Sequence, residues 1–563
     1  MKSYKIFTVV FLLSCLIVSC KKNYLDRAPG IALDEEKVFS DPVQAARFAD
    51  NAYNYLINDY IRFNDHRGST SQASDEAVSG NSESSVTTLN RGLYHDHSTS
   101  ASLNDMRDVW AREYAGIAIT NKTLNKISAI PVAAIFPAAR VEGEMRFLRA
   151  FFYFELIKRF GGVPLIIKVY DVNDDINLPR STYDECVNFI LADLEKAVTL
   201  LQNDADYGPS NYGRATKGAA LALKARVLLY AASPLNNPTN DKVKWKAAAD
   251  AAKEVIELSL YSLQATYTDL LNVPSSTEYI MIKVRGPRAI DGIFADYAMS
   301  PGSGGAQGQM DPTQNHVDLY EMAATGKGIT EAGSGYNPQQ PYVGRDPRFY
   351  ANILYNGAPW QGKTIETWAQ YGTSGNLLAN GKDYNPNSII YTATRYYCKK
   401  YWPEVYNRIG GTSGTTLFNY VFFRYGEVLL NYAEALNESD GPVADVYNSI
   451  NQIRKRAGMP NLPASLDQTQ MRNAVRHERA IELAFEDHRW YDIMRWKNGP
   501  DIVAKPIYGM NVIKNTNGTF TYTPVLLSST FQKVYFDYMH RYPIPKVEIY
   551  KSKGILVQNP GWE

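Results

Sequence analysis

The chain has 563 residues, a formal net charge of +1, 45% hydrophobic residues and 21% charged residues. These values are ordinary for a soluble globular protein, and they exclude the basic excess that favours a nucleic-acid partner. The length exceeds what one hydrophobic core needs, so two or three substructures are expected. The aromatic composition is unusual: 40 Tyr, 21 Phe and 8 Trp indicate either a Tyr-rich fold or a recognition surface.

The first twenty residues have the pattern of a bacterial lipoprotein signal. Lys2 and Lys5 precede an apolar run at residues 6–18, which is too short to span a bilayer, since that takes about twenty residues. The run ends in Ser19-Cys20, as in a lipobox, where a small residue precedes the cysteine that is lipidated. We therefore predict a signal peptide at 1–19 and a lipid-anchored tether at 20–40. An ordinary signal peptide is the alternative.

Helical periodicity dominates residues 41–285. The pattern predicts an N-terminal helical scaffold with one long loop at 62–100, where Ser, Asn, Asp, Gly and His accumulate. The expected helices span 41–58, 104–128, 139–160, 181–202, 216–232 and 243–258.

The segment RFLRAFFYFELIKRFGGVPL, residues 146–165, is the clearest helix signal. Apolar residues cover most of the helix circumference, so this helix should pack against neighbours on more than one side. Gly161 and Gly162 can adopt the left-handed conformation that ends a helix, and Pro164 prevents its continuation. A narrow polar stripe remains at Glu142, Arg146, Arg149 and Tyr153.

The residue composition changes after a short expected strand at 279–284. Residues 286–415 are rich in Gly, Pro, Asn, Tyr and Trp and show no sustained helical period. We interpret them as a loop-rich insertion that binds ligand, with short strands at 349–355 and 388–400.

Residues 416–563 return to helical periodicity and complete the scaffold. Because consecutive helices are antiparallel neighbours, the chain should form tetratricopeptide-like hairpins, although it has no strict repeat length. The predicted fold class is therefore mainly α: a tetratricopeptide-like helix-pair scaffold with a large irregular insertion containing short strands. The expected C-terminal helices span 419–437, 442–457, 467–497 and 549–553.

Residues 357–364, GAPWQGKT, match the spacing of a phosphate-binding loop. Such a loop needs a strand before it and a helix after it, so that backbone N–H groups surround the phosphate. Pro359 and the bulky Trp360 lie inside the segment, and no acidic strand that could bind Mg²⁺ is evident. A coincidental match is the favoured interpretation, and no cofactor is predicted.

The sequence also predicts no metal site. His477-Glu478 begins like a zinc-protease helix but lacks the second histidine four residues after the first. Besides Cys20, the mature chain has only Cys186 and Cys398, too few for a disulfide framework or a ligand cluster. Cys186 lies in a helical pattern and should be a buried, small apolar residue.

Glu482 and Glu486 are the best candidates for a pair of acid–base carboxylates. A glycosidase needs two carboxyl groups on either side of its substrate, and neighbours one turn apart on one helix are poorly placed for this. Ion pairs within the helix, such as Arg479 with Glu482 and Asp492 with Arg495, are the favoured interpretation. A glycoside hydrolase is thus the enzymatic runner-up to a non-catalytic protein.

The two loop-rich regions carry the candidate ligand-binding residues. Sugars present C–H faces that pack on aromatic rings and hydroxyl groups that need fixed polar partners. For any single residue, core packing or loop stabilisation is the alternative. The candidates are Asp65, His66, Arg67, Asp75, Tyr94, His95 and His97 in the first loop, and Tyr297, Gln309, Tyr336, Tyr342, Trp360 and Trp368 in the insertion.

Several segments together resemble the SusD/RagB family, the outer-membrane nutrient-binding lipoproteins of Bacteroidetes. The segment at 146–165 resembles the family's hallmark stretch, and the final YPIPKVEIYKSKGILVQNPGW resembles its C-terminal signature. Other matching segments lie at 216–230, 424–437, 451–460 and 476–496, so that with the lipobox the resemblance covers nearly the whole chain.

The resemblance implies a tetratricopeptide-like fold and a role at the cell surface. A SusD-like protein captures a glycan, without catalysis, and delivers it to a SusC-like TonB-dependent transporter in the outer membrane. A peptide-binding member of the family and a mainly structural lid of the transporter are the alternatives. Lys21 and Lys22 depart from the acidic residues that often follow the cysteine of surface-exposed lipoproteins, so surface exposure is implied by the family and not by the tether.

Overall fold

The computed structural model of the protein describes most of the chain after the predicted tether. The described residues are 34–57, 60, 68–80, 85–92, 104–171, 173–174, 177–284, 288–289, 298–305, 307–402, 415–416 and 419–562. The predicted signal peptide and Cys20 lie outside them.

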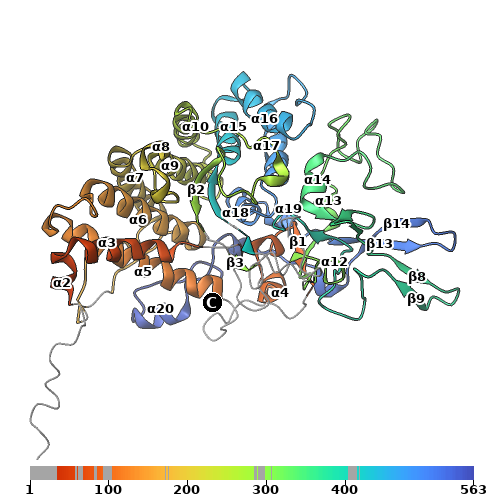
Figure 1. The fold of residues 1–563 in the computed structure, drawn as a ribbon, viewed down its shortest axis with the longest axis horizontal. Helices are drawn as coiled ribbons and strands as arrows, with labels where there is room; N and C mark the ends of the chain where they lie inside the picture. Colours follow the sequence, from red (N-terminus) through yellow and green to blue (C-terminus); the bar gives the residue numbers. More distant parts are fainter. Residues whose placement is uncertain are drawn as a thin grey trace, which may run out of the picture.

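A continuous array of antiparallel helices forms the left and upper parts of the molecule (Figure 1). Each helix packs on the next, and α10 then packs on α15, so the array continues across the insertion. The prediction of a mainly α, tetratricopeptide-like scaffold is confirmed. The array consists of α5 (Asn104–Lys126), α6 (Ala138–Phe160), α7 (Tyr183–Leu200), α9 (Lys217–Ala232), α10 (Lys242–Glu257), α15 (Tyr425–Asp440), α16 (Ala444–Arg456) and α17 (Gln468–Glu482).

Helix α6 is the inner helix that its sequence predicted. All of its residues from Phe147 to Phe160 are buried, and it packs between α5 and α7. It ends at Gly161, whose φ of 75° lies in the region that favours glycine. A Cβ at Gly162 would lie 2.0 Å from the Ser181 carbonyl oxygen, so the next segment can cross closely. The polar stripe has a structural use, because Arg149 donates to Asp193 of α7 over 2.7 and 2.8 Å.

The expected helix at 419–437 begins later than predicted. Residues Tyr420–Arg424 form strand β12, which pairs with β2 (Tyr279–Lys283), and the helix α15 starts only at Tyr425. The strand is buried throughout, and a fully buried short strand cannot be told from a helix by periodicity alone.

The expected helix at 467–497 is two helices, α17 and α18 (Arg489–Trp496). Phe485 and Asp487 between them have φ values of 64° and 66°, which an α-helix does not allow. The turn buries Phe485 against His316 at a ring-centroid distance of 5.0 Å. It also lets the Phe485 N–H donate to the buried Glu76 carboxylate over 3.0 Å.

The insertion contains short strands, and each expected range holds one, although both strands are shorter than predicted. Residues 347–352 form helix α14 (Pro347–Asn352), capped by Asp346 with Pro347 at its first position, and only Ile353–Leu354 form a strand, β5. It pairs with β10 (Tyr397–Cys398), the one strand that lies within the expected 388–400.

The C-terminal part of the chain contributes a hairpin to a sheet of the insertion. The strand order is β14-β13-β8-β9, and the sheet lies at the right in Figure 1. The hairpin of β13 (Tyr508–Lys514) and β14 (Phe520–Leu526) thus adjoins the hairpin of β8 (Ala369–Tyr371) and β9 (Leu377–Asn380). The expected boundary at 415/416 therefore separates segments that share one sheet, and the domain division stays a prediction.

Part of the region expected to be a long loop, 62–100, is instead buried structure. Residues 68–80 are buried throughout, and β1 (Ala77–Ser79) pairs with β4 (Met310–Pro312) of the insertion. The Lys533 ammonium donates to the carbonyl oxygens of Gln72 and Ala77 over 2.9 and 2.7 Å. These contacts satisfy backbone groups that water would otherwise have to reach.

The remaining elements are short. Residues expected as one helix at 41–58 form α3 followed by a 3₁₀ turn, and the last helix begins three residues before its expected start. Within the described residues, no helix combines the length and the apolar character that crossing a membrane requires. These elements are α2 (Glu35–Ser40), α3 (Pro42–Asp50), α4 (Ser85–Asn90), α8 (Asp204–Tyr207), α12 (Pro301–Gly304), α13 (Gln314–Val317), α19 (Gly499–Ile502), α20 (Lys546–Lys551), β3 (Arg288–Ala289), β6 (Pro359–Trp360), β7 (Lys363–Thr364) and β11 (Thr415–Thr416).

Candidate functional site

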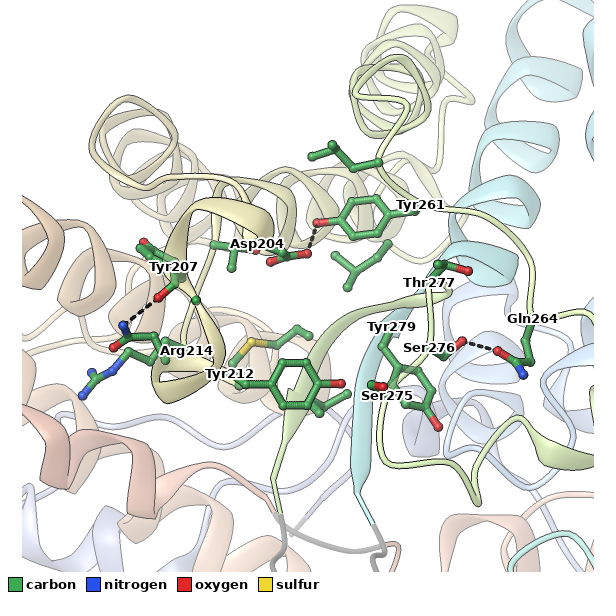
Figure 2. A pocket seen from close by; sticks show the side chains of 18 residues that line it. Asp204, Tyr207, Tyr212, Arg214, Tyr261, Gln264, Ser275, Ser276, Thr277 and Tyr279 are labelled. Atoms are coloured by element: carbon green, nitrogen blue, oxygen red, sulfur yellow. Dashed lines mark hydrogen bonds between the residues drawn. The ribbon is translucent and has the colours of Figure 1, made fainter.

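An open cleft of about 560 Å³ lies where the α8–α9 connection faces the segment between α10 and β2 (Figure 2). Strand β2 lines it with Tyr279 and the apolar side chains that follow. We name it the Tyr212 cleft. Its polar and aromatic lining is Asp204, Tyr207, Asn211, Tyr212, Arg214, Thr216, Tyr261, Gln264, Ser275, Ser276, Thr277 and Tyr279.

Tyr212 is the exposed aromatic ring of the cleft. Its side chain is 47% exposed, whereas Tyr207, Tyr261 and Tyr279 are buried and form walls. The Tyr212 hydroxyl donates to the Pro274 carbonyl oxygen over 3.3 Å, which ties the ring to the opposite side of the cleft. The following Gly213 has a φ of 88°, and a Cβ there would lie 2.8 Å from Val284. The local backbone therefore requires glycine to place the ring.

The polar groups of the cleft are fixed by hydrogen bonds to one another. Tyr261 donates to the Asp204 carboxylate over 2.9 Å, and Ser276 donates to the Gln264 amide oxygen over 2.6 Å (Figure 2). Burial raises the pKa of Asp204 and makes its charged form less favourable. The cleft thus presents preorganised hydroxyl and amide groups beside aromatic surface.

Among the described residues that line the cleft, Arg214 is the one cation, and it is already paired. Its guanidinium donates to Asp50 over 2.8 and 3.0 Å and to Glu144 over 2.9 Å. Burial alone would lower the pKa of Arg214, but the hydrogen bonds that it donates to Asp50 and the charge of Glu144 raise it. Arg214 therefore stays charged and is neutralised by the protein itself.

A second hollow of about 280 Å³ lies against the same side chains. Tyr212, Gly213, Arg214 and Ile282 line both cavities, and we name the new one the Asn54 hollow. Its cation, Lys283, donates to the carbonyl oxygens of residues 53 and 56 over 3.0 and 2.8 Å. Burial lowers the pKa of Lys283 to about 8.

Of the candidates from the first loop, the structure describes only Asp75. Asp65, His66, Arg67, Tyr94, His95 and His97 lie outside the described residues. Asp75 is buried, and its carboxylate accepts two hydrogen bonds from Arg489 over 2.8 and 2.9 Å. That pair joins residues 68–80 to α18, which is a structural role.

The candidates from the insertion are mostly buried as well. Tyr297 lies outside the described residues, while Gln309, Tyr342 and Trp360 are buried, Trp360 to 1% exposure. Tyr336 and Trp368 are half-buried, with Arg345 at 5.5 Å from the Tyr336 ring and Lys514 at 4.3 Å from the Trp368 ring. None of the described candidates lines the Tyr212 cleft.

Sequence reasoning missed the Tyr212 cleft because its residues lie in connections between helices. A signal was present, since DADYGPSNYGRAT at 204–216 combines Tyr, Asn, Asp and Gly as the candidate loops do. Nothing in the sequence showed that this connection faces residues 261–279.

The phosphate-loop match is coincidental. Residues 357–364 form the tight hairpin β6–β7, in which Pro359 pairs with Thr364 and Trp360 with Lys363. Trp360 points into the core, and residues 365–368 after the hairpin form no helix. The strand, loop and helix that phosphate binding needs are therefore not formed here.

The two glutamates considered as an acid–base pair belong to a buried ionic cluster. Arg424 lies 2.7 Å from both Glu482 and Glu486 and 2.8 Å from Glu278. We name this the Arg424 cluster, and every member is buried or nearly so. Its other members are Arg348, Arg454, Arg456, Lys400 and Glu478.

The cluster favours the ionised forms of Glu482 and Glu486. Burial would raise the pKa of Glu482, but the guanidinium groups of Arg456, Arg424 and Arg348 lower it below the usual range. Lys400 and Arg424 have the same effect on Glu486. A general acid must hold a proton and reach its substrate, and these carboxylates do neither.

The other sequence expectations about charged and sulfur-containing residues have mixed outcomes. Asp492 pairs with Arg495 at 2.8 Å as expected, but Arg479 pairs with Asp492 at 3.1 Å and not with Glu482. Cys186 is buried, as predicted, and so is Cys398. Among the described residues, no group of His, Cys, Asp and Glu could hold a metal ion.

Comparison with known proteins identifies the family. The model of the SusD family matches residues 279–562, and the model described as "Starch-binding associating with outer membrane" matches residues 23–229. The chain therefore belongs to the SusD family. The SusD-like protein P2 of Formosa agariphila is 26% identical over 475 residues, which cover 80% of each chain.

Solved structures show the same fold. A SusD-like protein from Bacteroides fragilis aligns with a TM-score of 0.76 and 29% identity, covering 95% of this chain and 100% of that one. A SusD-like carbohydrate binding protein from the same species aligns with a TM-score of 0.74 and 22% identity, covering 92% and 99%.

Proposed function

We propose that this member of the SusD family is a non-catalytic glycan-binding lipoprotein of the outer membrane. It captures an oligosaccharide or polysaccharide at the cell surface and delivers it to a SusC-like TonB-dependent transporter. Family membership supports this role, because one matching model is described as starch-binding and outer-membrane associated.

The observation that carries glycan binding to this chain is the Tyr212 cleft. A sugar needs an apolar platform for its C–H face and fixed polar partners for its hydroxyl groups. The half-exposed Tyr212 ring offers the platform, and Asp204, Gln264 and Ser276 offer polar groups already held in place. We place at least one sugar unit on Tyr212.

The absence of catalysis is part of the proposal. Among its described lining residues, the Tyr212 cleft has Asp204 as the single carboxyl group, whereas glycoside hydrolysis uses two that flank the scissile bond. Glu482 and Glu486 are enclosed by the Arg424 cluster. Incubation with a bound glycan should therefore release no product.

The lipid anchor is expected on Cys20, with residues 20–40 as the tether. In the described structure, Glu35 of α2 lies 2.7 Å from Lys122 and 3.2 Å from Lys126, at the last turns of α5. These pairs fasten the end of the tether to the helical scaffold. Metabolic labelling with palmitate, lost in Cys20→Ser, would test the anchor, and protease accessibility on whole cells would test the surface location.

A panel of polysaccharides tests glycan binding directly. Calorimetry should find a binder, and Tyr212→Ala should weaken it by about tenfold, which corresponds to about 1.4 kcal/mol. Tyr550→Ala is the matched control, because Tyr550 on α20 is 74% exposed and lies outside the cleft. If no glycan binds the wild-type protein, or if both variants bind equally well, the proposal is wrong.

Copurification tests the transporter partnership. A SusC-like transporter produced with this protein should remain bound through purification, both with wild-type protein and with Tyr212→Ala. Loss of the complex only in Tyr212→Ala would instead place Tyr212 in the protein interface.

A further inference from the structure

The Tyr212 cleft and the Asn54 hollow adjoin at Tyr212, and together we name them the Tyr212 path. Both cavities are lined by Tyr212, Gly213 and Arg214, so the exposed Tyr212 ring stands where they meet. Their volumes are about 560 and 280 Å³. A ligand that rests on Tyr212 can therefore extend to either side of it.

Both cavities have polar side chains that are exposed to solvent. Ser275 and Thr277 are exposed at the rim of the Tyr212 cleft, and Asn54 and Ser210 are exposed in the Asn54 hollow. Asn54 donates to the Asn51 side chain over 2.8 Å, which fixes its amide. A site with polar groups on both sides of an aromatic ring suits the middle of a chain as well as its end.

The cations that line these two cavities already have partners within the protein. Asp50 and Glu144 neutralise Arg214, and the Lys283 ammonium is directed at two backbone carbonyl groups. An acidic sugar would find no unpaired cation among the described lining residues. It would meet the Asp204 carboxylate in the Tyr212 cleft, which no cation of the described lining pairs with, so its own charge would be repelled there.

From this geometry we infer that the ligand is an uncharged oligosaccharide chain of at least two units, which crosses Tyr212 and occupies both cavities. This inference rests on the proposed function and names the substrate class for the same site. The Tyr212 ring supports one unit, the Tyr212 cleft binds the larger part of the chain, and the Asn54 hollow binds its continuation.

Blocking one cavity at a time tests the path. We expect affinity for neutral oligosaccharides of the bound glycan to rise with length in the wild-type protein. Asn54→Trp should abolish that rise, with about a tenfold loss for the longest ligand and less than about a twofold change for the shortest one. Ser275→Trp should weaken ligands of every length.

Ser210→Trp fills the same hollow from a different segment. It is a second test in case Asn54→Trp causes a local folding defect. Thermal unfolding of each variant should match the wild-type protein, because the replaced side chains are exposed. If Asn54→Trp and Ser210→Trp both keep the full length dependence, the ligand does not enter the Asn54 hollow and the inference is overturned.

A comparison of neutral and uronic-acid oligosaccharides of equal length tests the charge. Neutral ligands should bind at least about tenfold more tightly at low salt. Equal or tighter binding of the acidic ligand, lost in Tyr212→Ala, would overturn the substrate class while leaving glycan binding intact. Binding of neither class would overturn the proposed function itself.

Discussion

The Arg424 cluster and the Tyr212 cleft are the two polar regions that the structure contrasts most clearly. The cluster contains charged side chains that saturate one another in the core. The cleft is open to solvent and contains hydroxyl, amide and aromatic groups. Arg214, the one cation among its described lining residues, is paired with Asp50. By residue type alone, two glutamates of the cluster were the best candidates for catalysis. The cleft, however, is the region that a ligand can reach.

The two regions are also connected. Glu278, at the start of β2, accepts from Arg424 over 2.8 Å and from the backbone N–H of Gln264 over 2.6 Å. The Glu278 N–H in turn donates to Ser276 over 3.1 Å. Gln264 and Ser276 line the cleft, so the buried charges support one of its walls.

The largest expected effect comes from removing the central cation of the cluster. Arg424→Met leaves Glu278, Glu482 and Glu486 short of a partner and should lower the free energy of unfolding by about 3–5 kcal/mol. Guanidinium unfolding measures this. Lys246→Met is the control, because it removes only the exposed pair with Asp250, and should change stability by less than about 1 kcal/mol. Similar values for both variants would show that the cluster is not stabilised as described.

A second test separates buried from exposed aromatic residues. Trp360→Ala should lower the free energy of unfolding by about 3–5 kcal/mol, because its side chain is 1% exposed in the core. Glycan affinity, measured where the variant is folded, should stay within about twofold of wild type. Tyr212→Ala should show the reverse pattern. A larger loss of glycan affinity in Trp360→Ala would show that Trp360 contributes to ligand binding and would contradict this prediction.

The pH dependence of the free energy of unfolding tests the buried carboxyl group of Glu76. Burial raises the pKa of Glu76 from 4.5 to about 7, despite the N–H of Phe485. Between these pH values the folded state holds a proton that the unfolded state has lost, so this group destabilises the fold as pH rises. Relative to wild type, Glu76→Gln should therefore gain about 3 kcal/mol between pH 4.5 and pH 7. Urea unfolding across that range measures it, and a constant difference would contradict it.

The smallest expected effect concerns the Tyr212 hydroxyl. Tyr212→Phe keeps the ring but loses the bond to the Pro274 carbonyl oxygen, so affinity should fall only about two- to fivefold, which corresponds to about 0.5–1 kcal/mol. Calorimetry with the best glycan measures it. A loss as large as that of Tyr212→Ala would show that the hydroxyl, and not the ring face, binds the ligand.

The helices were predictable because their signals are local. Helix α7 is 18 residues long and begins after Thr182, whose side chain and that of Glu185 form a capping box. Helix α9 was expected at 216–232 and spans Lys217–Ala232. The stop after α6 follows from the backbone freedom of glycine at Gly161. Each of these signals lies within a few residues of the boundary that it marks.

The errors lie where distant segments determine local structure. The break after Glu482 depends on Glu486 reaching Arg424 and Lys400, and on Phe485 packing against His316. Likewise, Trp360 and Asp75 looked like surface candidates until the fold placed them in the core and opposite Arg489. The contact between Asp75 and Arg489 joins residues that lie 414 positions apart in the chain.

By itself, the sequence determined the mainly α fold class, the positions of the array helices apart from the start of α15 and the end of α17, and the resemblance to the SusD family. Periodicity, caps and motifs are sufficient for these, because they act over one or two helical turns. Only the tertiary structure decided which polar groups saturate one another and which remain open. In the folded protein, residues 204–216 face residues 261–279. No local sequence pattern specifies a contact between two such segments that connect helices and strands.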